Sequence, residues 1–182
     1  YNNGVNAGRL SFTTDLPAAV QGSDLIFIAV GTPPLPDGAA DLRAVWAVAD
    51  EIADAMDHHC TVIVKSTVPV GTSQEVQARI VARTEQSFDI ANNPEFLKEG
   101  LAIDDFNKPD RVVVGVERPE VGELLTELYM PFRRSGCPMV VADIRTSELI
   151  KYVSNAMLAT KISFINEMAN LCERVGADVD EL

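Results

Sequence analysis

Apolar stretches of strand length alternate with amphipathic stretches of helix length along most of this chain, and this alternation constrains the fold more than any other feature of the sequence. We expect strands over residues 24–30, 61–65, 88–91, 111–116 and 139–142, and helices over 41–57, 73–83 and 119–132, the first of these with Asp41 as its N-cap. Such an order is typical of an α/β fold in which crossover helices join the strands of a parallel sheet.

A second helical pattern runs almost without interruption from residue 146 to residue 175, and Gly176 is the expected stop signal. About 30 helical residues at 1.5 Å per residue span roughly 45 Å, which is too long for a helix confined to one small domain. Apolar residues occur all round this helix. Two interpretations stay open, namely burial against a partner chain and docking on the helix's own domain.

Composition excludes several classes of partner. The chain has 182 residues, 47% of them hydrophobic, and a formal net charge of −12, which argues against binding to nucleic acid or to an anionic membrane. No apolar run approaches about 18 residues and no signal peptide is visible, so we expect a cytoplasmic protein.

The few cysteines and histidines give no sign of a metal site. Cys60, Cys137 and Cys172 are widely spaced and odd in number, which favours reduced thiols over disulfides or zinc ligands. His58 and His59 are adjacent and have no partner at metal-ligand spacing, so we interpret them as a solvated helix end. We therefore expect no metal.

The segment 92–100 places two carboxylates, Glu95 and Glu99, four residues apart directly after an expected strand. Asn93-Pro94 is a turn signal, and Pro94 is expected to open a helix that carries both acids on one face. Ligands of open α/β sheets bind outside the carboxyl ends of the strands, so acid/base chemistry is a reasonable hypothesis here. The alternative is that both acids merely stabilise a helix N-terminus.

A polar pair also interrupts the long helix. Lys151 and Asn155 are four residues apart and project from the same face of an otherwise apolar stretch. A lysine on a helix is usually solvated, but this helix is too apolar to be mostly exposed.

Five segments, taken together, resemble the UDP-glucose/GDP-mannose dehydrogenase family, and most closely its members that act on UDP-glucose. They are 30–34, 65–72, 93–100, 108–115 and the helix that carries Lys151 and Asn155, in the order of the family and over essentially the whole chain. The resemblance implies a Rossmann-like doubly wound parallel sheet over residues 1–144, incomplete at its N-terminal unit, and a long connecting and dimerisation helix over 145–182.

The resemblance also implies a reaction. The family oxidises C6 of a nucleotide sugar to the uronate with two sequential hydride transfers to NAD, which for UDP-glucose gives UDP-glucuronate for polysaccharide biosynthesis. A cysteine captures the intermediate aldehyde, and the resulting thioester is hydrolysed. A nucleotide-sugar substrate and a homodimer formed through the long helix are expected with it.

Roles for particular residues follow from the resemblance alone. Lys151 would stabilise charge on the C6 oxygen or move its proton, Asn155 would donate a hydrogen bond there, Glu95 would be the general acid/base, and Thr67 would hold a water or the nicotinamide end. The implied cofactor contacts are Val30, Gly31, Thr32, Pro33, Ser66, Thr67 and Glu99, and the implied substrate contacts are Glu95, Phe96, Leu97, Lys98, Glu99, Lys151 and Asn155. The alternative for Thr67 is a structural role in a Ser-Thr turn or as a helix cap. The alternative for Phe96 and Leu97 is a place in the core.

Two departures from the family pattern concern the cofactor phosphates and the nucleophile. The sequence contains no G-x-G-x-x-G, and none of its cysteines has the setting of the family's catalytic cysteine. We therefore expect an internal fragment that is inactive alone. Dehydrogenases of GDP-mannose or UDP-N-acetylhexosamine, and a non-catalytic nucleotide-binding or dimerisation piece, remain open alternatives.

Overall fold

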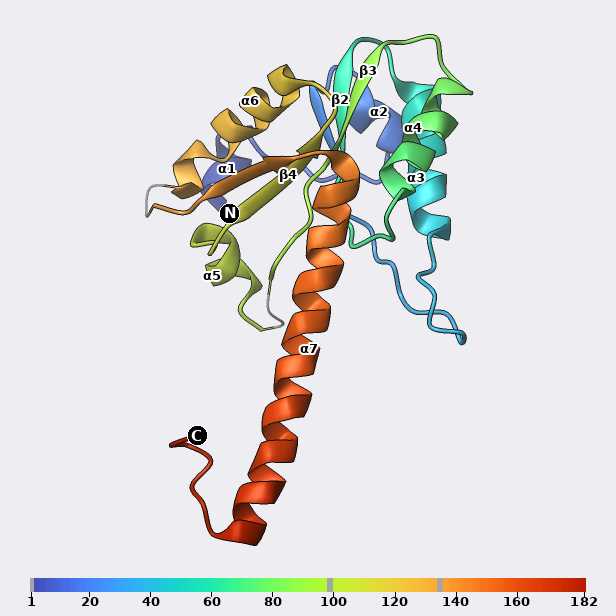
Figure 1. Cartoon of the computed structure of the whole chain (residues 1–182). Helices are drawn as coiled ribbons and strands as arrows, with labels where there is room; N and C mark the ends of the chain where they lie inside the picture. The colour runs from blue at the N-terminus through green and yellow to red at the C-terminus, as the bar shows by residue number, and fades with distance from the viewer. Residues whose placement is uncertain (1, 98–99, 134–135) are drawn as a thin grey trace.

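The computed structural model describes residues 2–97, 100–133 and 136–182 (Figure 1). Its centre is a five-stranded sheet in the order β1-β2-β3-β4-β5. The strands are β1 (Leu25–Ile28), β2 (Cys60–Val64), β3 (Phe88–Asn92), β4 (Val112–Val116) and β5 (Met139–Ala142). Every residue of β2 is buried, as expected for a central strand covered by helices on both faces.

The described residues contain the four predicted helices, each within a few residues of its expected bounds, and four short helices that were not predicted. They are α1 (Asn2–Asn6), α2 (Leu16–Val20), α3 (Arg43–Ala55), α4 (Thr72–Val81), α5 (Ala102–Asn107), α6 (Pro119–Leu128), the 3-10 helix η1 (Met130–Arg133) and α7 (Ile144–Val175). The prediction for Asp41 is wrong, since Leu42 is the N-cap of α3. The Asp41 carboxylate instead accepts hydrogen bonds from the backbone and the guanidinium of Arg43.

Two separate apolar clusters fill the two faces of the sheet, which confirms the doubly wound α/β prediction. Ile28, Val62 and Ile90 point toward α3 and α4 and belong to one cluster. Ile63, Ala91 and Val114 point the other way and pack with Val121 and Leu125 of α6. Neighbouring strand residues thus belong to different cores, as the two-residue repeat of a strand requires.

The sheet departs from the prediction at one pair of strands. β1, β2 and β3 are parallel, and β4 is parallel to β5, but β4 is antiparallel to β3 with Asn92 opposite Gly115. Among the described residues that connect β3 to β4, α5 is the one helix, and it buries none of its residues and does not cross a face of the sheet. The chain therefore returns from the same edge at which β3 ends.

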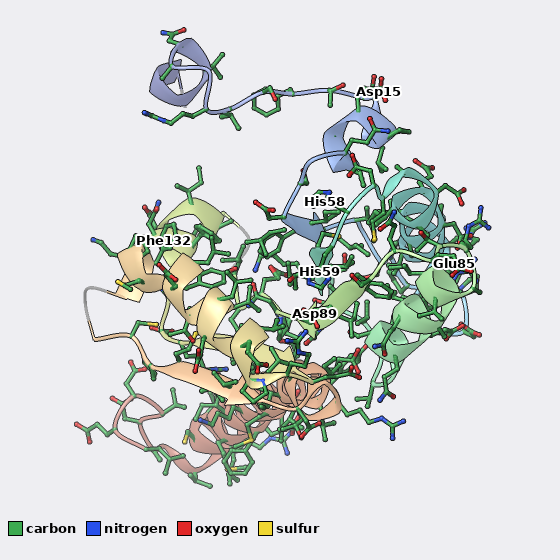
Figure 2. The ribbon with its side chains drawn as sticks, turned by 90° about the horizontal axis from the view of Figure 1, so that it is seen from above. Asp15, His58, His59, Glu85, Asp89 and Phe132 are labelled. Atoms are coloured by element: carbon green, nitrogen blue, oxygen red, sulfur yellow. The ribbon has the colours of Figure 1, made fainter. Side chains whose placement is uncertain are left out.

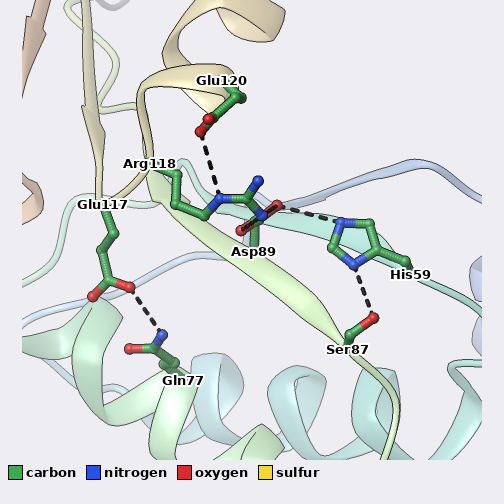
Figure 3. A network of polar contacts seen from close by, with 7 residues as sticks. All are labelled: His59, Gln77, Ser87, Asp89, Glu117, Arg118 and Glu120. Carbon is green, nitrogen blue, oxygen red and sulfur yellow. Dashed lines mark hydrogen bonds and ion pairs between the residues drawn. The ribbon is translucent and has the colours of Figure 1, made fainter.

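Two further predictions need correction. Pro94 begins no helix, because residues 93–97 have no regular secondary structure. His59 is more than a solvated helix end: its ring lies 3.3 Å from the Asp89 carboxylate and 3.1 Å from the Ser87 hydroxyl. Figure 3 shows this contact continuing through Arg118, which also pairs with Asp89 and joins β3 to the start of α6.

The short peripheral helices differ in how closely they pack against the rest of the fold. Figure 2 shows α1 standing apart from the other elements, joined to α2 by the segment that contains Asp15. In the same view Phe132 lies beside α6, and its ring packs edge-on against Phe106 of α5 at 5.0 Å between centroids. Within the described residues, no helix combines the length and apolar content that crossing a membrane requires.

Candidate active site

A pocket of about 380 Å³ lies where β2 and β3 end and β4 begins. The antiparallel direction of β4 is what brings its first residues to this edge. α7 forms one wall and α5 contributes another. The described lining residues are Lys65, Asn93, Pro94, Glu95, Phe96, Leu97, Asp105, Phe106, Lys108, Pro109, Asp110, Arg111, Val112, Tyr129, Lys151, Ser154, Asn155 and Leu158.

The structure therefore brings the two predicted groups together. Glu95, Phe96 and Leu97 come from the loop after β3, while Lys151 and Asn155 come from α7, and all five line one pocket. Lys98 and Glu99, also predicted as site residues, lie outside the described residues.

Phe96 stands at the centre of the charged groups in this pocket. The guanidinium carbon of Arg111 lies 4.3 Å from the centroid of its ring, and the Lys151 ammonium nitrogen lies 5.2 Å from it. Cations over an aromatic face are attracted by its quadrupole, so the ring helps hold both side chains in place. Arg111 is fixed further by a 3.1 Å hydrogen bond that it donates to Ser154 of α7.

Lys151 is only 7% exposed, although it carries a charged group. Burial lowers the pKa of Lys151, the nearby Glu95 carboxylate opposes this, and Arg111 reinforces it by repulsion. A lysine that loses its proton more easily than usual suits both proton transfer and the stabilisation of a developing oxyanion.

The floor of the pocket is a hydrogen-bond network centred on Asn93. Its side-chain oxygen accepts from the Tyr129 hydroxyl and, at 3.3 Å, from the Lys65 ammonium, while its amide nitrogen donates to the Val113 carbonyl at 2.8 Å. Burial raises the pKa of Tyr129 to about 12, so the phenol stays protonated as a donor. The network holds in place the start of the loop that carries Glu95.

The first turns of α7 are anchored by buried polar contacts. The Glu148 carboxylate accepts from the Gly71 backbone N–H at 2.6 Å, and from the backbone N–H and hydroxyl of Ser73 at 2.9 and 2.7 Å. Ser147 donates to Asn92 at 2.7 Å. Because Lys151 follows Glu148 by about one turn, these contacts fix where the lysine enters the pocket.

The predicted cofactor residues other than Glu99, which is outside the described residues, lie apart from this lining, on the loops after β1 and β2. Ser66 donates to the Val30 carbonyl at 2.6 Å, and Thr32 donates to the Thr67 carbonyl at 2.8 Å, so the two loops are tied together. Thr67 does not cap α4, whose N-cap is Gly71. Pro33 continues the first of these loops, and its carbonyl accepts a hydrogen bond from the Asp41 N–H.

Gly31 provides a direct test of whether these loops suit a cofactor. A Cβ added there would meet no atom within 4 Å, so nothing inside the chain requires glycine at this position. Open space above a glycine at the end of a parallel strand is what a closely bound dinucleotide needs. The loops therefore fit such a cofactor, although no G-x-G-x-x-G is present for its phosphates.

Other residues of the pocket were not predicted. Lys65 could have been found, because it ends a buried strand next to Ser66. Arg111 could not be assigned to this edge from a sheet expected to be parallel throughout. Among residues 2–97, 100–133 and 136–182, no group of three or more His, Cys, Asp or Glu side chains could hold a metal ion.

A sheet wound on both faces, with open loops at the carboxyl ends of its first strands, defines an α/β domain of the Rossmann type, the class that binds nucleotides at this edge. The chain belongs to the UDP-glucose/GDP-mannose dehydrogenase family: the family's NAD binding domain matches residues 1–133, and its central domain matches residues 145–182. NAD is the cofactor of this domain.

Relatives with established names are close in sequence and structure. The chain is 52% identical to the UDP-glucose 6-dehydrogenase of Rhizobium meliloti and 46% identical to that of Pseudomonas aeruginosa, over 98% of this chain but only 42% and 40% of those proteins. It is 43% identical, with a TM-score of 0.90, to a UDP-glucose dehydrogenase structure from Pyrobaculum islandicum, covering 98% of this chain and 42% of that one. It is 37% identical, with a TM-score of 0.91, to GDP-mannose dehydrogenase from Pseudomonas aeruginosa in a ternary complex. That match covers 99% of this chain and 42% of the other.

Proposed function

We propose that the chain serves the NAD-dependent oxidation of UDP-glucose at C6 to UDP-glucuronate. The observation that carries this proposal is the meeting of Glu95, Lys151 and Asn155 in one pocket, although they come from segments more than 50 residues apart. The names of the relatives supply the reaction class, and the pocket supplies groups of the kinds that the reaction needs.

NAD, when bound, accepts a hydride from the sugar carbon in each of the two oxidations. Val30, Gly31, Thr32 and Pro33 would hold it on one side, and Ser66 and Thr67 on the other, because these residues face each other across the ends of β1 and β2. Glu99 belongs to this proposed cofactor contact and lies outside the described residues.

Lys151 would meet the C6 oxygen. Its desolvated ammonium stabilises the negative charge that develops there or takes part in moving the hydroxyl proton. Asn155, one turn further along α7, would donate a hydrogen bond to the same oxygen or to a water.

Glu95 would act as general acid/base for the water that hydrolyses the acyl intermediate. Thr67 would hold that water or the nicotinamide end of the cofactor. Phe96 and Leu97 would pack against the sugar nucleotide, with Lys98 beside them in the sequence. The described pocket contains none of Cys60, Cys137 and Cys172 in its lining. Burial also raises the pKa of Cys60 to about 11, which makes it a poor nucleophile.

GDP-mannose is the second candidate substrate. The dehydrogenase of GDP-mannose from Pseudomonas aeruginosa superposes as well as the UDP-glucose enzyme, with TM-scores of 0.91 and 0.90. The lower identity, 37% against 43%, ranks it second. UDP-N-acetylhexosamines form a third group to test.

We also propose a homodimer formed through α7. Met157, Phe164 and Leu171 are 54%, 62% and 50% exposed in the single chain, and a long helix with so much exposed apolar surface is typical of an interface. Phe164→Glu with Leu171→Glu should shift the complete gene product toward monomer by light scattering. Asn166→Glu, at an exposed position on the opposite face of the helix, should not. A wild-type monomer at micromolar concentration would refute the dimer.

The catalytic proposal is tested with the complete gene product that contains these residues. With NAD and UDP-glucose we expect two NADH per sugar, little or no NADH from GDP-mannose or UDP-N-acetylglucosamine, and a loss of at least about 100-fold in kcat for Lys151→Ala. The 182-residue chain alone should produce no NADH. Preference for GDP-mannose would replace the substrate assignment, and unchanged activity of Lys151→Ala would refute the site.

A further inference from the structure

Lys65 has no role in the proposed function, yet it lies in the same pocket as Lys151. We propose that Lys65 is a positioning residue that acts through Lys151: the two lysines form a coupled pair over Glu95, in which the charge on either ammonium makes the other give up its proton more readily. The role of this pair in catalysis rests on the proposed function, whereas the coupling itself can be tested without it.

The position of Lys65 is fixed by the network on the pocket floor. Asn93 commits its amide nitrogen to the Val113 carbonyl, so its oxygen must face Lys65 and Tyr129. Asn93 is 2% exposed and cannot turn away without breaking these bonds. The Lys65 ammonium is therefore held in the pocket by a neutral acceptor, which leaves its charge uncompensated by that contact.

Lys151 is held from the other side. Glu148 anchors its helix to the start of α4, and the ring of Phe96 lies 5.2 Å from its ammonium. Neither Phe96 nor Asn93 carries a charge. Lys65 directly follows β2 and Lys151 belongs to α7, so the two lysines approach the same pocket from different parts of the fold. Neither is neutralised by the group that positions it.

Glu95 is the carboxylate that acts on both ammoniums. Burial lowers the pKa of Lys65, the attraction of Glu95 opposes the shift, and the repulsion of Lys151 adds to it. Burial is also the largest cause that lowers the pKa of Lys151, and the attraction of the same carboxylate opposes it. Repulsion between two charges is mutual, so what Lys151 does to Lys65 is returned in equal measure. The other charged or titratable described groups in the pocket are Asp105, Lys108, Asp110, Arg111 and Tyr129.

Two ammoniums that share a single carboxylate repel each other, so one of them loses its proton more readily than an isolated lysine would. The resulting free amine can accept the proton of a substrate hydroxyl. Lys65 would then contribute to the proposed reaction without touching the sugar.

The test measures the proton affinity of each lysine directly, without cofactor or substrate. The chain has five lysines, so reductive [13C]methylation gives few NMR signals to assign and titrate. The pKa of Lys151 is compared between Lys65→Arg, which keeps the charge, and Lys65→Met, which removes it. We expect the pKa of Lys151 to be about one unit lower in Lys65→Arg than in Lys65→Met.

The reciprocal pair makes the result independent of any single variant. The pKa of Lys65, compared between Lys151→Arg and Lys151→Met, should differ by the same amount, because the coupling is mutual. Lys161→Met, on the exposed part of α7, should move neither value.

Differences below about 0.3 units in both comparisons would overturn the proposal, and unequal differences would mean that the variants changed the pocket structure instead. Circular dichroism identifies any variant that fails to fold, and the other comparison then decides. Activity of the enzyme is not involved, so a failed coupling and a failed functional assignment are distinguishable.

Discussion

Ser73 donates two hydrogen bonds to the buried Glu148 carboxylate, one from its backbone N–H and one from its hydroxyl, across 75 residues of sequence. Glu148 thereby satisfies N–H groups at the start of α4 that have no partner within that helix. The contact joins the helix that follows β2 to the helix that carries Lys151, so the two sides of the candidate site share one anchor.

Loss of this anchor should be costly. Glu148→Ala leaves the partly buried Gly71 donor and the buried Ser73 donors without an acceptor, and we expect the free energy of unfolding to fall by about 2–3 kcal/mol. Glu148→Gln has the same shape and keeps one acceptor oxygen, so it should cost less. Urea unfolding followed by circular dichroism measures both, and an alanine variant within about 0.5 kcal/mol of wild type would refute the anchoring role.

Close packing of α7 against the sheet predicts the effect of a single methyl group. A Cβ at Gly115 would lie 2.5 Å from the Ser147 Cβ and 2.7 Å from the Ile144 Cα. Gly115→Ala must therefore displace the start of α7 and should destabilise the fold by about 1–3 kcal/mol. The matched control is Gly31→Ala, which adds the same methyl group in open space and should leave the unfolding midpoint within experimental error.

The same control is a probe of cofactor binding. Alanine at Gly31 meets nothing in the chain, but it occupies the space proposed for NAD. We expect at least about ten-fold weaker NAD binding by calorimetry, equal to about 1.4 kcal/mol. Unchanged affinity would place the cofactor elsewhere, whatever the stability of the variant.

Tyr129 should make stability fall at alkaline pH. Its pKa is raised by burial from 10 to about 12, so the folded state holds its proton more tightly than the unfolded chain. This contribution is fully present below pH 10 and is lost as pH rises toward 12, with about 1 kcal/mol gone by pH 11. Tyr129→Phe should be about 1 kcal/mol less stable at pH 8, through loss of the bond to Asn93, and about equal to wild type at pH 11. A constant difference across this range would contradict the assignment.

The sequence was sufficient for the elements whose signals are local. Gly176 ends α7 in the left-handed conformation at φ 75°, as its position after the last apolar residue indicates. Periodicity and the family resemblance predict the five strands, the helices α3, α4, α6 and α7, the two-sided core and the presence of Glu95 and Lys151 at one edge. The short helices α1, α2 and α5 were not predicted.

What could not be predicted depends on contacts between distant segments. The direction of β4 is set by whether α5 crosses the sheet, and six residues with none buried give no signal for that. Arg111 reaches the pocket only because of this direction. The local turn signal at Pro94 was also misleading, because the Asn93 side chain is bound to Val113, Tyr129 and Lys65 in the tertiary structure.

Because α7 is long and is anchored near its start, a small tilt at Glu148 would move its two ends by very different amounts. The helix leaves the sheet at Glu148 and continues to Val175 without support from the rest of the domain over most of its length (Figure 1). At 1.5 Å per residue, Gly176 is about 42 Å from Glu148 and Asn155 only about 10 Å. A tilt of about 5° would shift the far end by about 4 Å and Asn155 by less than about 1 Å. In such a tilt the far end of α7 would move by several ångströms while the groups around Lys151 stayed aligned.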